Sequence, residues 1–503
     1  MCFLFAEESF VQGCLKYTIP DHDKEIVFVE FNRPHALNRV RSASNRTLRI
    51  PGTIDFNGKT FKVASIYPYG FSEYNEMDSL IIEEGMECID ENAFSNCTNL
   101  RTVYIPSSIK RIYGNVFANC PNIERIEVAP NNLIYNSDNK CNAIIHTTNH
   151  ELISGCKNTL IPSTVITIGN YAFKGNNELD SIYIPDGVEN INTGAFSGCF
   201  NLRNIQLPKS LQHMGTNIFE GCESLHSLFI PKNVRNIEFN PLADCRYLSE
   251  IIVDKDNPLF DSRNNCNAII KTEKNELISG CSTTIIPNNV VRIGSNAFSG
   301  ISELTHITIP ENVTKISGGA FKGCPALISI QVDKNNKVYD SRNGCNAIIE
   351  SATHTLVCGC GGTIIPENIK VIGPQAFNGM TTPQNVSIPK SVTRIEWFAF
   401  EYCPTIQQVI IPGTIRYIGK SAFQCCRNLK KVIIENGELE NIVYETFYGC
   451  SNLESVTLPE NLKTIMDGAF AHCNNLENIV MPSTQTVIEP RAFEGCFSDP
   501  KIE

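Results

Sequence analysis

Long hydrophobic runs are absent from this 503-residue sequence. No stretch approaches the roughly 18 consecutive apolar residues that a membrane-spanning helix needs, so we expect no transmembrane segment. The first residues, Met-Cys-Phe-Leu-Phe-Ala, reach Glu7 and Glu8 without a basic segment, so no secretory signal peptide is evident. An exported chain whose leader has been lost and an ordinary cytoplasmic chain would both begin in this way.

Positive charge is also scarce. The 42 Lys and Arg residues are outnumbered by 53 Asp and Glu residues, which gives a net charge of -11. We do not expect such an acidic chain to bind nucleic acid, because binding to the phosphate backbone depends on clustered cations.

Motifs of catalysis and cofactor binding are missing as well. The sequence has no Gly-x-Gly-x-x-Gly stretch that leads from a strand into a helix, no phosphate-binding loop and no Gly-x-Ser-x-Gly elbow. Cys358 and Cys360 are close in sequence but lack the spacing and the partner ligands of a zinc site. We therefore expect no enzyme activity, no cofactor and no bound metal.

What the sequence does contain is a short motif, Ala-Phe-x-x-Cys, that recurs at a nearly constant interval. Ten of the fourteen gaps between successive Phe positions are 23 residues, one is 24, and three are 56. A fixed period in the twenties is typical of a solenoid, in which each turn packs only on its two neighbours. The Phe position is occupied by Phe71, Phe94, Phe117, Phe173, Phe196, Phe219, Leu242, Phe298, Phe321, Phe377, Phe400, Phe423, Phe447, Phe470 and Phe493.

Eleven of the 22 cysteines follow this Phe position by three residues. Because the same position elsewhere holds Tyr74, Asn176, Ile301 or Met380, we interpret it as a small buried site in which free Cys packs as a compact hydrophobe. The eleven are Cys97, Cys120, Cys199, Cys222, Cys245, Cys324, Cys403, Cys426, Cys450, Cys473 and Cys496.

Each repeat also contains the pattern of a short strand. In residues 100–120, Val103 and Ile105 alternate with Thr102 and Tyr104, as in a half-buried strand. Pro106 then ends the strand, because proline has no N–H to donate. Stacked repeats would place these strands in a parallel sheet with a spacing of about 4.8 Å.

The repeat resembles the BspA-type leucine-rich repeats, also called the Treponema pallidum type. The segments Leu304–Phe321 and Ile365–Phe377 match that pattern closely, and the resemblance covers about residues 48–496. It implies a mainly β, right-handed leucine-rich-repeat solenoid of about 15 repeats of 23 residues. It also implies a secreted or cell-surface protein that attaches to host, matrix or other cells, and it brings no catalytic residues with it.

The three 56-residue gaps hold matching insertions, near residues 128–160, 253–285 and 332–364. In each, two apolar stretches flank a polar turn, which predicts a β-hairpin that rides on the solenoid. One Cys precedes the first strand and another follows the second, so a hairpin would place the two side by side. A disulfide there would contribute about 3 kcal/mol; the alternative is two reduced thiols that fill the base of the hairpin. The pairs are Cys141 and Cys156, Cys266 and Cys281, and Cys345 and Cys360.

Residues 1–48 lack the repeat. Two alternating stretches, Leu15–Ile19 and Glu25–Phe31, read as strands. A solenoid needs a cover over its first exposed turn, so we expect residues 1–48 to form an N-terminal β cap. The solenoid itself is expected over residues 49–496, followed by a short tail, 497–503.

The residues that the strand pattern turns outward are the candidate ligand contacts. In the first strand of the repeat this column includes Tyr104, Tyr183, Phe229 and Ile410. Exposed aromatic rings on a sheet face often anchor interfaces. The alternative is that they pack on one another as cross-strand neighbours.

A second outward column, in the short strand that follows, contains the basic residues Arg111, Arg292, Lys315 and Arg394 and no acidic residue. In an acidic protein this column could meet an acidic ligand or a glycan. The alternative is a solvated face whose charges prevent aggregation of the sheet.

These observations favour a non-catalytic binding or adhesion protein that presents a solenoid surface to a protein or glycan on a host, a matrix or a neighbouring cell. The expected location is secreted or at the cell surface, with the cytoplasm as the alternative. The alternative function is a structural spacer or scaffold at the cell surface without a defined ligand face.

Overall fold

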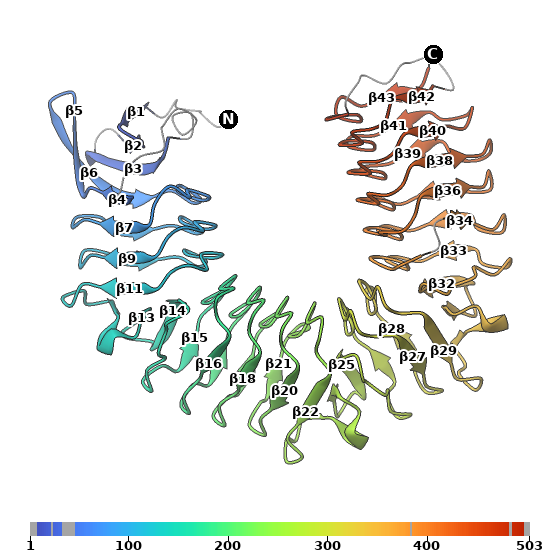
Figure 1. Ribbon diagram of the computed structural model, residues 1–503, viewed down its shortest axis with the longest axis horizontal. Coiled ribbons are helices and arrows are strands. Elements are labelled where there is room, and N and C mark those ends of the chain that lie inside the picture. Colours follow the sequence, from blue (N-terminus) through green and yellow to red (C-terminus); the bar gives the residue numbers. More distant parts are fainter. Residues whose placement is uncertain (1–7, 22–23, 33–45, 383–384, 482–484, 497–503) are drawn as a thin grey trace. The chain divides into compact units, whose positions relative to one another are not determined.

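The computed structural model describes residues 8–21, 24–32, 46–382, 385–481 and 485–496, so the expected tail at 497–503 lies outside the described residues. The chain divides into two compact units. Unit 1 comprises Met1–Cys245 and Val253–Asn257, and unit 2 comprises Arg246–Ile252 and Pro258–Glu503. Both are stacks of short β-strands (Figure 1), and no α-helix occurs within the described ranges. In particular, no described helix has the length and hydropathy to cross a bilayer.

Within each unit, the strand that precedes the turn proline forms a first parallel ladder. Strands of successive turns pair in register, so that Val103 lies opposite Ile126 and Val409 lies opposite Val432. In unit 1 the strands are β4 (Thr47–Ile50), β7 (Ser79–Ile82), β9 (Thr102–Ile105), β11 (Arg125–Val128), β16 (Ser181–Tyr183), β18 (Asn204–Gln206) and β20 (Ser227–Ile230). In unit 2 they are β22 (Glu250–Val253, of which Val253 counts with unit 1), β27 (His306–Ile309), β29 (Ser329–Val332), β34 (Asn385–Ser387), β36 (Gln408–Ile411), β38 (Lys431–Ile434), β40 (Ser455–Thr457) and β42 (Asn478–Val480).

A second parallel ladder consists of two-residue strands that follow the turn. In unit 1 these are β8 (Cys88–Ile89), β10 (Arg111–Ile112), β15 (Thr167–Ile168), β17 (Asn190–Ile191), β19 (His213–Met214) and β21 (Asn236–Ile237). In unit 2 they are β26 (Arg292–Ile293), β28 (Lys315–Ile316), β33 (Val371–Ile372), β35 (Arg394–Ile395), β37 (Tyr417–Ile418), β39 (Asn441–Ile442), β41 (Thr464–Ile465) and β43 (Val487–Ile488). In most of these strands the second residue is a buried aliphatic side chain, which puts the first residue outward.

The phenylalanine anchors stack ring on ring inside each unit. Successive centroids are 4.9–5.6 Å apart and the ring planes differ by at most 19°. The stacks are Phe71 to Phe117 and Phe173 to Phe219 in unit 1, and Phe298 to Phe321 and Phe377 to Phe493 in unit 2. The expected solenoid with its aromatic spine is therefore confirmed in both units.

The eleven cysteines of the repeat have a second role besides packing. Each Sγ donates a hydrogen bond of 3.0–3.2 Å to the backbone carbonyl of the Phe one turn earlier. Cys222 Sγ, for example, is 3.2 Å from Phe196 O. A thiol is therefore useful here because it is apolar enough to be buried and still satisfies a carbonyl. The sequence pattern indicated the burial but not this bond.

The insertions differ from the expectation of hairpins that ride on the solenoid. Each is a three-stranded antiparallel unit whose last strand pairs in parallel with the next strand of the second ladder. Each insertion thus supplies one turn of its own, and the fold has about 18 turns instead of 15. The strands are β12 (Tyr135–Asn136), β13 (Ala143–His146) and β14 (Glu151–Gly155); β23 (Phe260–Asp261), β24 (Ala268–Lys271) and β25 (Glu276–Gly280); and β30 (Tyr339–Asp340), β31 (Ile348–Glu350) and β32 (Thr355–Cys358).

A single turn of 3-10 helix precedes the first Cys of each insertion. The three are η3 (Asp138–Lys140), η4 (Arg263–Asn265) and η5 (Arg342–Gly344). Their middle residues, Asn139, Asn264 and Asn343, have φ of 56°, 58° and 56°, a region that Asn tolerates better than most residues. The near-identical geometry shows that the three insertions are copies of one structural module.

The N-terminal strands form an antiparallel meander that joins the second ladder. β3 (Ile26–Phe31) pairs in parallel with β6 (Lys59–Ile66), which in turn pairs with β8. The remaining strands of this region are β1 (Glu8–Gln12), β2 (Leu15–Asp21) and β5 (Thr53–Phe56). The two predicted strands are found, while the proposed boundary of the cap near residue 48 stays a prediction.

Candidate functional site

Several outward side chains of the first ladder in unit 1 are large, apolar and exposed. We call the surface formed by Tyr104, Leu160, Tyr183, Gln206 and Phe229 the first-ladder face. Tyr183 lies opposite Gln206 in the register of β16 and β18. Tyr183 is 72% exposed and Phe229 is 50% exposed, although the residues beside them in the same strands are buried.

A shallow hollow of about 380 Å³ lies on this face. It is lined by Ser181, Ile182, Tyr183, Asn204, Ile205, Gln206 and Ser227. The polar and aromatic side chains therefore surround the depression, and its base consists of the ladder itself.

Tyr104 is placed differently from the other two aromatic residues. It is half-buried and lies in register with Ile81 of β7 and Glu127 of β11. Together with Thr47, Ser79, Thr102 and Arg125 these residues line a second hollow, of about 430 Å³. Tyr104 is therefore less exposed than Tyr183, and the choice between ligand binding and cross-strand packing for this residue stays a prediction.

Leu160 was missed by the sequence analysis. It is 70% exposed, and its counterparts in the other two insertions, Ile285 and Ile364, are 76% and 75% exposed. The sequence did contain a signal for these residues. Each insertion has two apolar residues directly before a proline, as the strands of the first ladder do: Thr159-Leu-Ile-Pro, Thr284-Ile-Ile-Pro and Thr363-Ile-Ile-Pro. Leu160 also belongs to the turn next to that of Tyr183, since a Cβ at Gly187 would be 3.4 Å from Ser163 O.

Ile410 lies on the outward side of the first ladder in unit 2. Its neighbours in register are Ser387 and Ile433. Ile410 is exposed, whereas Ile433 is half-buried. The outward positions of these three turns therefore hold one Ser and two Ile residues and no aromatic ring.

The basic column of the second ladder is not free of acidic residues, contrary to the expectation. Because β14 and β25 join this ladder, Glu151 lies in register with Thr167 and Glu276 lies in register with Arg292. The glutamates were overlooked because the sequence analysis treated the insertions as lying outside the ladder. Arg292 and Lys315 are adjacent in register, while Arg111 is an exposed residue of unit 1 opposite Cys88.

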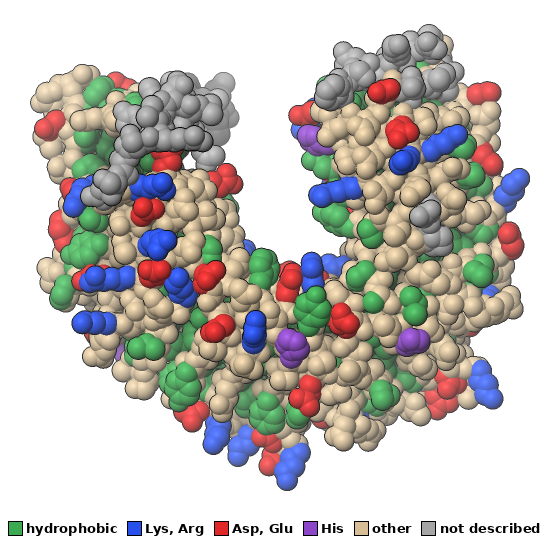
Figure 2. Space-filling view, viewed as in Figure 1, with side chains coloured by type: hydrophobic (Ala, Val, Ile, Leu, Met, Phe, Trp, Pro, Cys, Tyr) green, Lys and Arg blue, Asp and Glu red, His purple; other side chains and the backbone are tan. Residues whose placement is uncertain are grey.

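Two of the four cations are partly neutralised by neighbours. Arg292 Nε is 3.7 Å from Glu276 Oε1, and Arg394 Nη2 is 2.9 Å from Glu396 Oε1. Arg394 also stacks over Tyr417 at 4.5 Å from the ring centroid. On the face drawn in Figure 2, basic and acidic side chains are interspersed within each unit. The second ladder is therefore a mixed-charge surface.

The six cysteines of the insertions are buried free thiols in the structure. Cys156, Cys281 and Cys360 donate through Sγ to the backbone carbonyls of Asn142, Asn267 and Asn346, at 3.2–3.4 Å. Cys141, Cys266 and Cys345 lie at the same end of each hairpin as their partners, since Ala143 is opposite Gly155 in register. Burial raises the pKa of all three thiols. The structure thus contains the reduced thiols of the alternative interpretation, and a disulfide within each cysteine pair stays a prediction.

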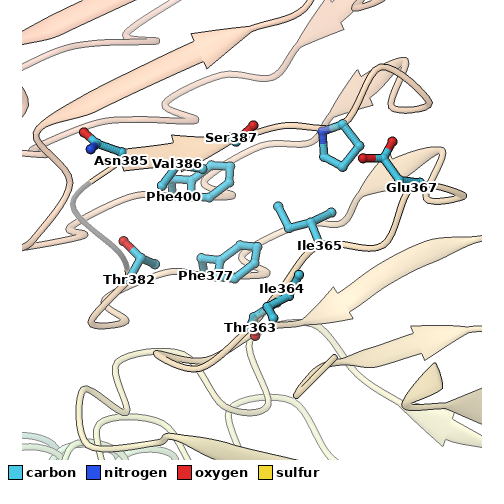
Figure 3. A pocket seen from close by; sticks show the side chains of 11 residues that line it. Thr363, Ile364, Ile365, Glu367, Phe377, Thr382, Asn385, Val386, Ser387 and Phe400 are labelled. Carbon is cyan, nitrogen blue, oxygen red and sulfur yellow. The ribbon is translucent and has the colours of Figure 1, made fainter. Parts of the chain in front are cut away.

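Unit 2 contains a cavity of about 320 Å³ between the segment 363–367 and strand β34 (Figure 3). The stacked rings of Phe377 and Phe400, with centroids 4.9 Å apart, form its inner wall. Ile364, Ile365 and Val386 line the sides, and Glu367 lies at the edge. Within the described part of the chain, no group of three or more His, Cys, Asp or Glu side chains is placed to hold a metal ion.

The two ladders, the aromatic spine and the turn prolines define a leucine-rich-repeat solenoid. The family model for the BspA type leucine rich repeat region (6 copies) matches residues 64–155, 143–269, 274–353 and 357–445. A general leucine rich repeat model matches residues 427–485. The chain therefore belongs to the BspA-type leucine-rich-repeat family.

Several solved structures are similar to this chain at low sequence identity. A leucine rich cell surface protein from Faecalibacterium prausnitzii is 22% identical, with 97% of this chain and 92% of that chain covered and a TM-score of 0.37. A leucine-rich repeat protein from Bacteroides ovatus is also 22% identical, with 97% and 86% covered and a TM-score of 0.31. The T. pallidum leucine rich repeat protein is 18% identical over 56% of this chain and 76% of its own, with a TM-score of 0.17. No curated protein matches the sequence significantly.

Proposed function

We propose that this protein is a non-catalytic binding or adhesion protein of the cell surface, and that the first-ladder face contacts a protein or glycan partner. The partner would be on a host cell, a matrix or a neighbouring cell. The observation that carries the proposal is the exposure of Tyr183 and Phe229 on the outward side of the first ladder.

The register of the ladder supports a binding role for these rings over mutual packing. The residue opposite Tyr183 is Gln206, so no aromatic neighbour covers the ring from the adjacent strand. Large exposed apolar side chains cost solubility, and a face that groups several of them is typical of an interaction surface. Aromatic residues contribute more to such interfaces than most other residues because they bury a large area with little loss of side-chain entropy.

The proposed location rests on the family and on the similarity to a protein described as a leucine rich cell surface protein. Antibody labelling of intact cells tests it directly. Labelling without permeabilisation is the expected result, and labelling only after permeabilisation would contradict a surface location.

Binding is tested with the full-length protein on immobilised extracellular matrix proteins and on a glycan array. The double variant Tyr183→Ala/Phe229→Ala should weaken binding to any partner found by about tenfold or more. The matched control is Thr308→Ala, an outward residue of the same ladder in unit 2. If the double variant binds as well as the control, the first-ladder face is not the binding surface. If the wild-type protein binds nothing on either array, the alternative of a structural spacer is favoured.

A further inference from the structure

The third insertion separates two turns of unit 2 on one side only. On the ladder side, β30, β31 and β32 stand between β28 and β33, and Tyr339 Oη accepts a hydrogen bond of 3.0 Å from the Ile316 N–H. On the loop side nothing intervenes, because the Gly323 N–H donates directly to Asn378 O at 2.8 Å. The two turns are therefore splayed like a wedge, with the gap on the side of the ladder.

The residues that follow the last short strand before each insertion differ from one insertion to the next. Ile112 is followed by Tyr113-Gly-Asn, and Ile237 is followed by Glu238-Phe-Asn. Ile316 is followed by Ser317-Gly318-Gly319, so at the third insertion no large side chain is available. A Cβ built on Gly318 has no atom within 4 Å. The result is a cavity of about 290 Å³.

The lining of this cavity is apolar inside and polar at the edge. Phe321, Val357 and Cys358 are among its apolar residues, and Ser317, Thr355 and Gln375 contribute hydroxyl and amide groups. Trp397, the one tryptophan of the chain, reaches the cavity from the next turn and is 41% exposed. A small pocket with an apolar base and a few converging polar groups is typical of a ligand site.

The charge of the lining is positive. Lys322 is its ionic residue, and the lining contains no carboxylate. Glu401 is outside the lining but close enough to interact with the positive charge of Lys322. It accepts a hydrogen bond of 2.6 Å from Asn378 Nδ2. Burial raises the pKa of Glu401, and Asn378 and Lys322 oppose that rise only in part.

We propose that this cavity binds one carboxylate-bearing sugar residue of a glycan. A pyranose has apolar C–H faces that pack against an indole ring, and hydroxyl groups around its edge that pair with Ser317, Thr355 and Gln375. The sugar carboxylate pairs with the Lys322 ammonium, a charge-assisted contact in a partly enclosed site. The site is in unit 2 and shares no residue with the first-ladder face, so it stands or fails independently of the function proposed above.

Because Trp397 is the one tryptophan and lines this cavity, its fluorescence reports on the surroundings of that indole ring. The full-length protein is titrated with a hyaluronan hexasaccharide and with 3′-sialyllactose, and in parallel with the neutral counterparts chitohexaose and lactose. We expect a saturable change in Trp397 fluorescence with at least one acidic glycan, and about tenfold weaker affinity for its neutral counterpart.

Two variants locate the site. Gly318→Phe places in the cavity the side chain that Phe239 has at the equivalent position of the second insertion, and should abolish the fluorescence response. Lys322→Gln should reduce affinity for the acidic glycan to that for the neutral one and leave the fold unchanged. The matched control is Gly114→Phe at the first insertion, where an added Cβ is also in open space.

The proposal is overturned if neither acidic glycan changes the fluorescence, or if neutral and acidic glycans bind equally. It is also overturned if Gly318→Phe, with wild-type circular dichroism and thermal unfolding, responds like Gly114→Phe. Should Gly318→Phe fail to fold, Lys322→Gln decides the question by itself, because unchanged affinity in that variant excludes the carboxylate contact.

Discussion

The ring of Phe298 lies directly against the backbone of Gly280. A Cβ added at Gly280 would be 2.2 Å from Phe298 Cε1, far inside the contact distance of two carbon atoms. Gly155 and Phe173, and Gly359 and Phe377, repeat the relationship at 2.2 Å and 2.0 Å. A glycine therefore ends the last strand of the first two insertions and directly follows that of the third, because the first ring of the next aromatic stack occupies the space of a side chain.

Gly280→Ala should destabilise the protein by about 1–3 kcal/mol, as overpacking does in a dense core. The measurement is urea denaturation of the purified protein. Gly318→Ala is the matched control in the same unit, since its methyl group meets open space, and we expect a change within about 0.5 kcal/mol. In a Phe298→Leu background the cost of Gly280→Ala should fall; an unchanged cost would show that the ring is not the obstacle.

Phe400→Ala should be among the most destabilising single changes in unit 2. Its ring is fully buried between Phe377 and Phe423, at centroid distances of 4.9 and 5.0 Å. Loss of a buried phenylalanine side chain leaves a cavity and costs about 3–5 kcal/mol. Phe493→Ala is the comparison, because Phe493 is half-buried at the last position of the stack and should cost less. Equal losses in chemical denaturation would contradict a spine that is stabilised by neighbours on both sides.

The cysteine column should resist alkylation in the folded protein. Burial raises the pKa of Cys199 to about 12, so at pH 8 the reactive thiolate is nearly absent. Cys14, Cys425 and Cys496, the last cysteine of the column, are half-buried and should react first with iodoacetamide, as followed by peptide mass spectrometry. Labelling of Cys199 as fast as Cys14 would contradict this accessibility order.

The same experiment tests the cysteines of the insertions. When the protein is isolated from its native compartment and alkylated without reductant, a disulfide between Cys266 and Cys281 would appear as one cross-linked peptide pair. Free, buried thiols would appear as peptides that are labelled only after unfolding. The second outcome is expected from the hydrogen bond of Cys281 Sγ to Asn267 O at 3.3 Å.

Asp340 should make stability depend on pH. Burial by itself raises the pKa of this carboxyl, but hydrogen bonds from Arg342 and Ser351 outweigh it and hold the pKa below its usual value. Arg342 Nε is 2.6 Å from Asp340 Oδ1. Because the folded-state pKa is depressed, this contribution is present above the unfolded pKa of about 3.9 and is lost as the pH falls through the folded pKa.

Asp340→Asn should therefore reduce the free energy of unfolding at pH 7 by about 1 kcal/mol or less, since the pair is partly exposed and screened by solvent. The difference from wild type should shrink as the pH is lowered from 5, and also in 1 M salt. A difference that stays constant down to acidic pH would show that the carboxylate charge is not responsible. The control is Asn136, the equivalent residue of the first insertion, where Asn136→Ala should show no such pH dependence.

The period of the repeat predicted the fold class because it describes contacts between neighbouring turns. The residues that recur every 23 positions, Phe196 and Cys222 among them, must meet their counterparts once the turns stack. The outward position of Tyr183 and Phe229 followed from the alternation of a strand. Tyr104 shows the limit of that reasoning, because its exposure depends on which side chains are opposite it in register, here Ile81 and Glu127.

The insertions are where sequence reasoning was incomplete. A hairpin pattern indicates two antiparallel strands, but it does not say whether the outer edge of the second strand stays free or pairs with another element. In the structure that edge is used, so β14, β25 and β32 become turns of the solenoid and Glu151 and Glu276 enter the basic column. The cavity beside Gly318 was equally hidden, since it arises from two turns that are splayed on one side.

The sequence by itself determined the length of each turn, the aromatic and thiol spine and the side of each strand that faces solvent, because these depend on local alternation and on a constant spacing. Only the tertiary structure decided what the three insertions do, because hydrogen-bond pairing between non-repeating segments depends on which backbone edges meet in space. That pairing sets the number of turns, the charges along the second ladder and the place where a missing side chain leaves room for a ligand.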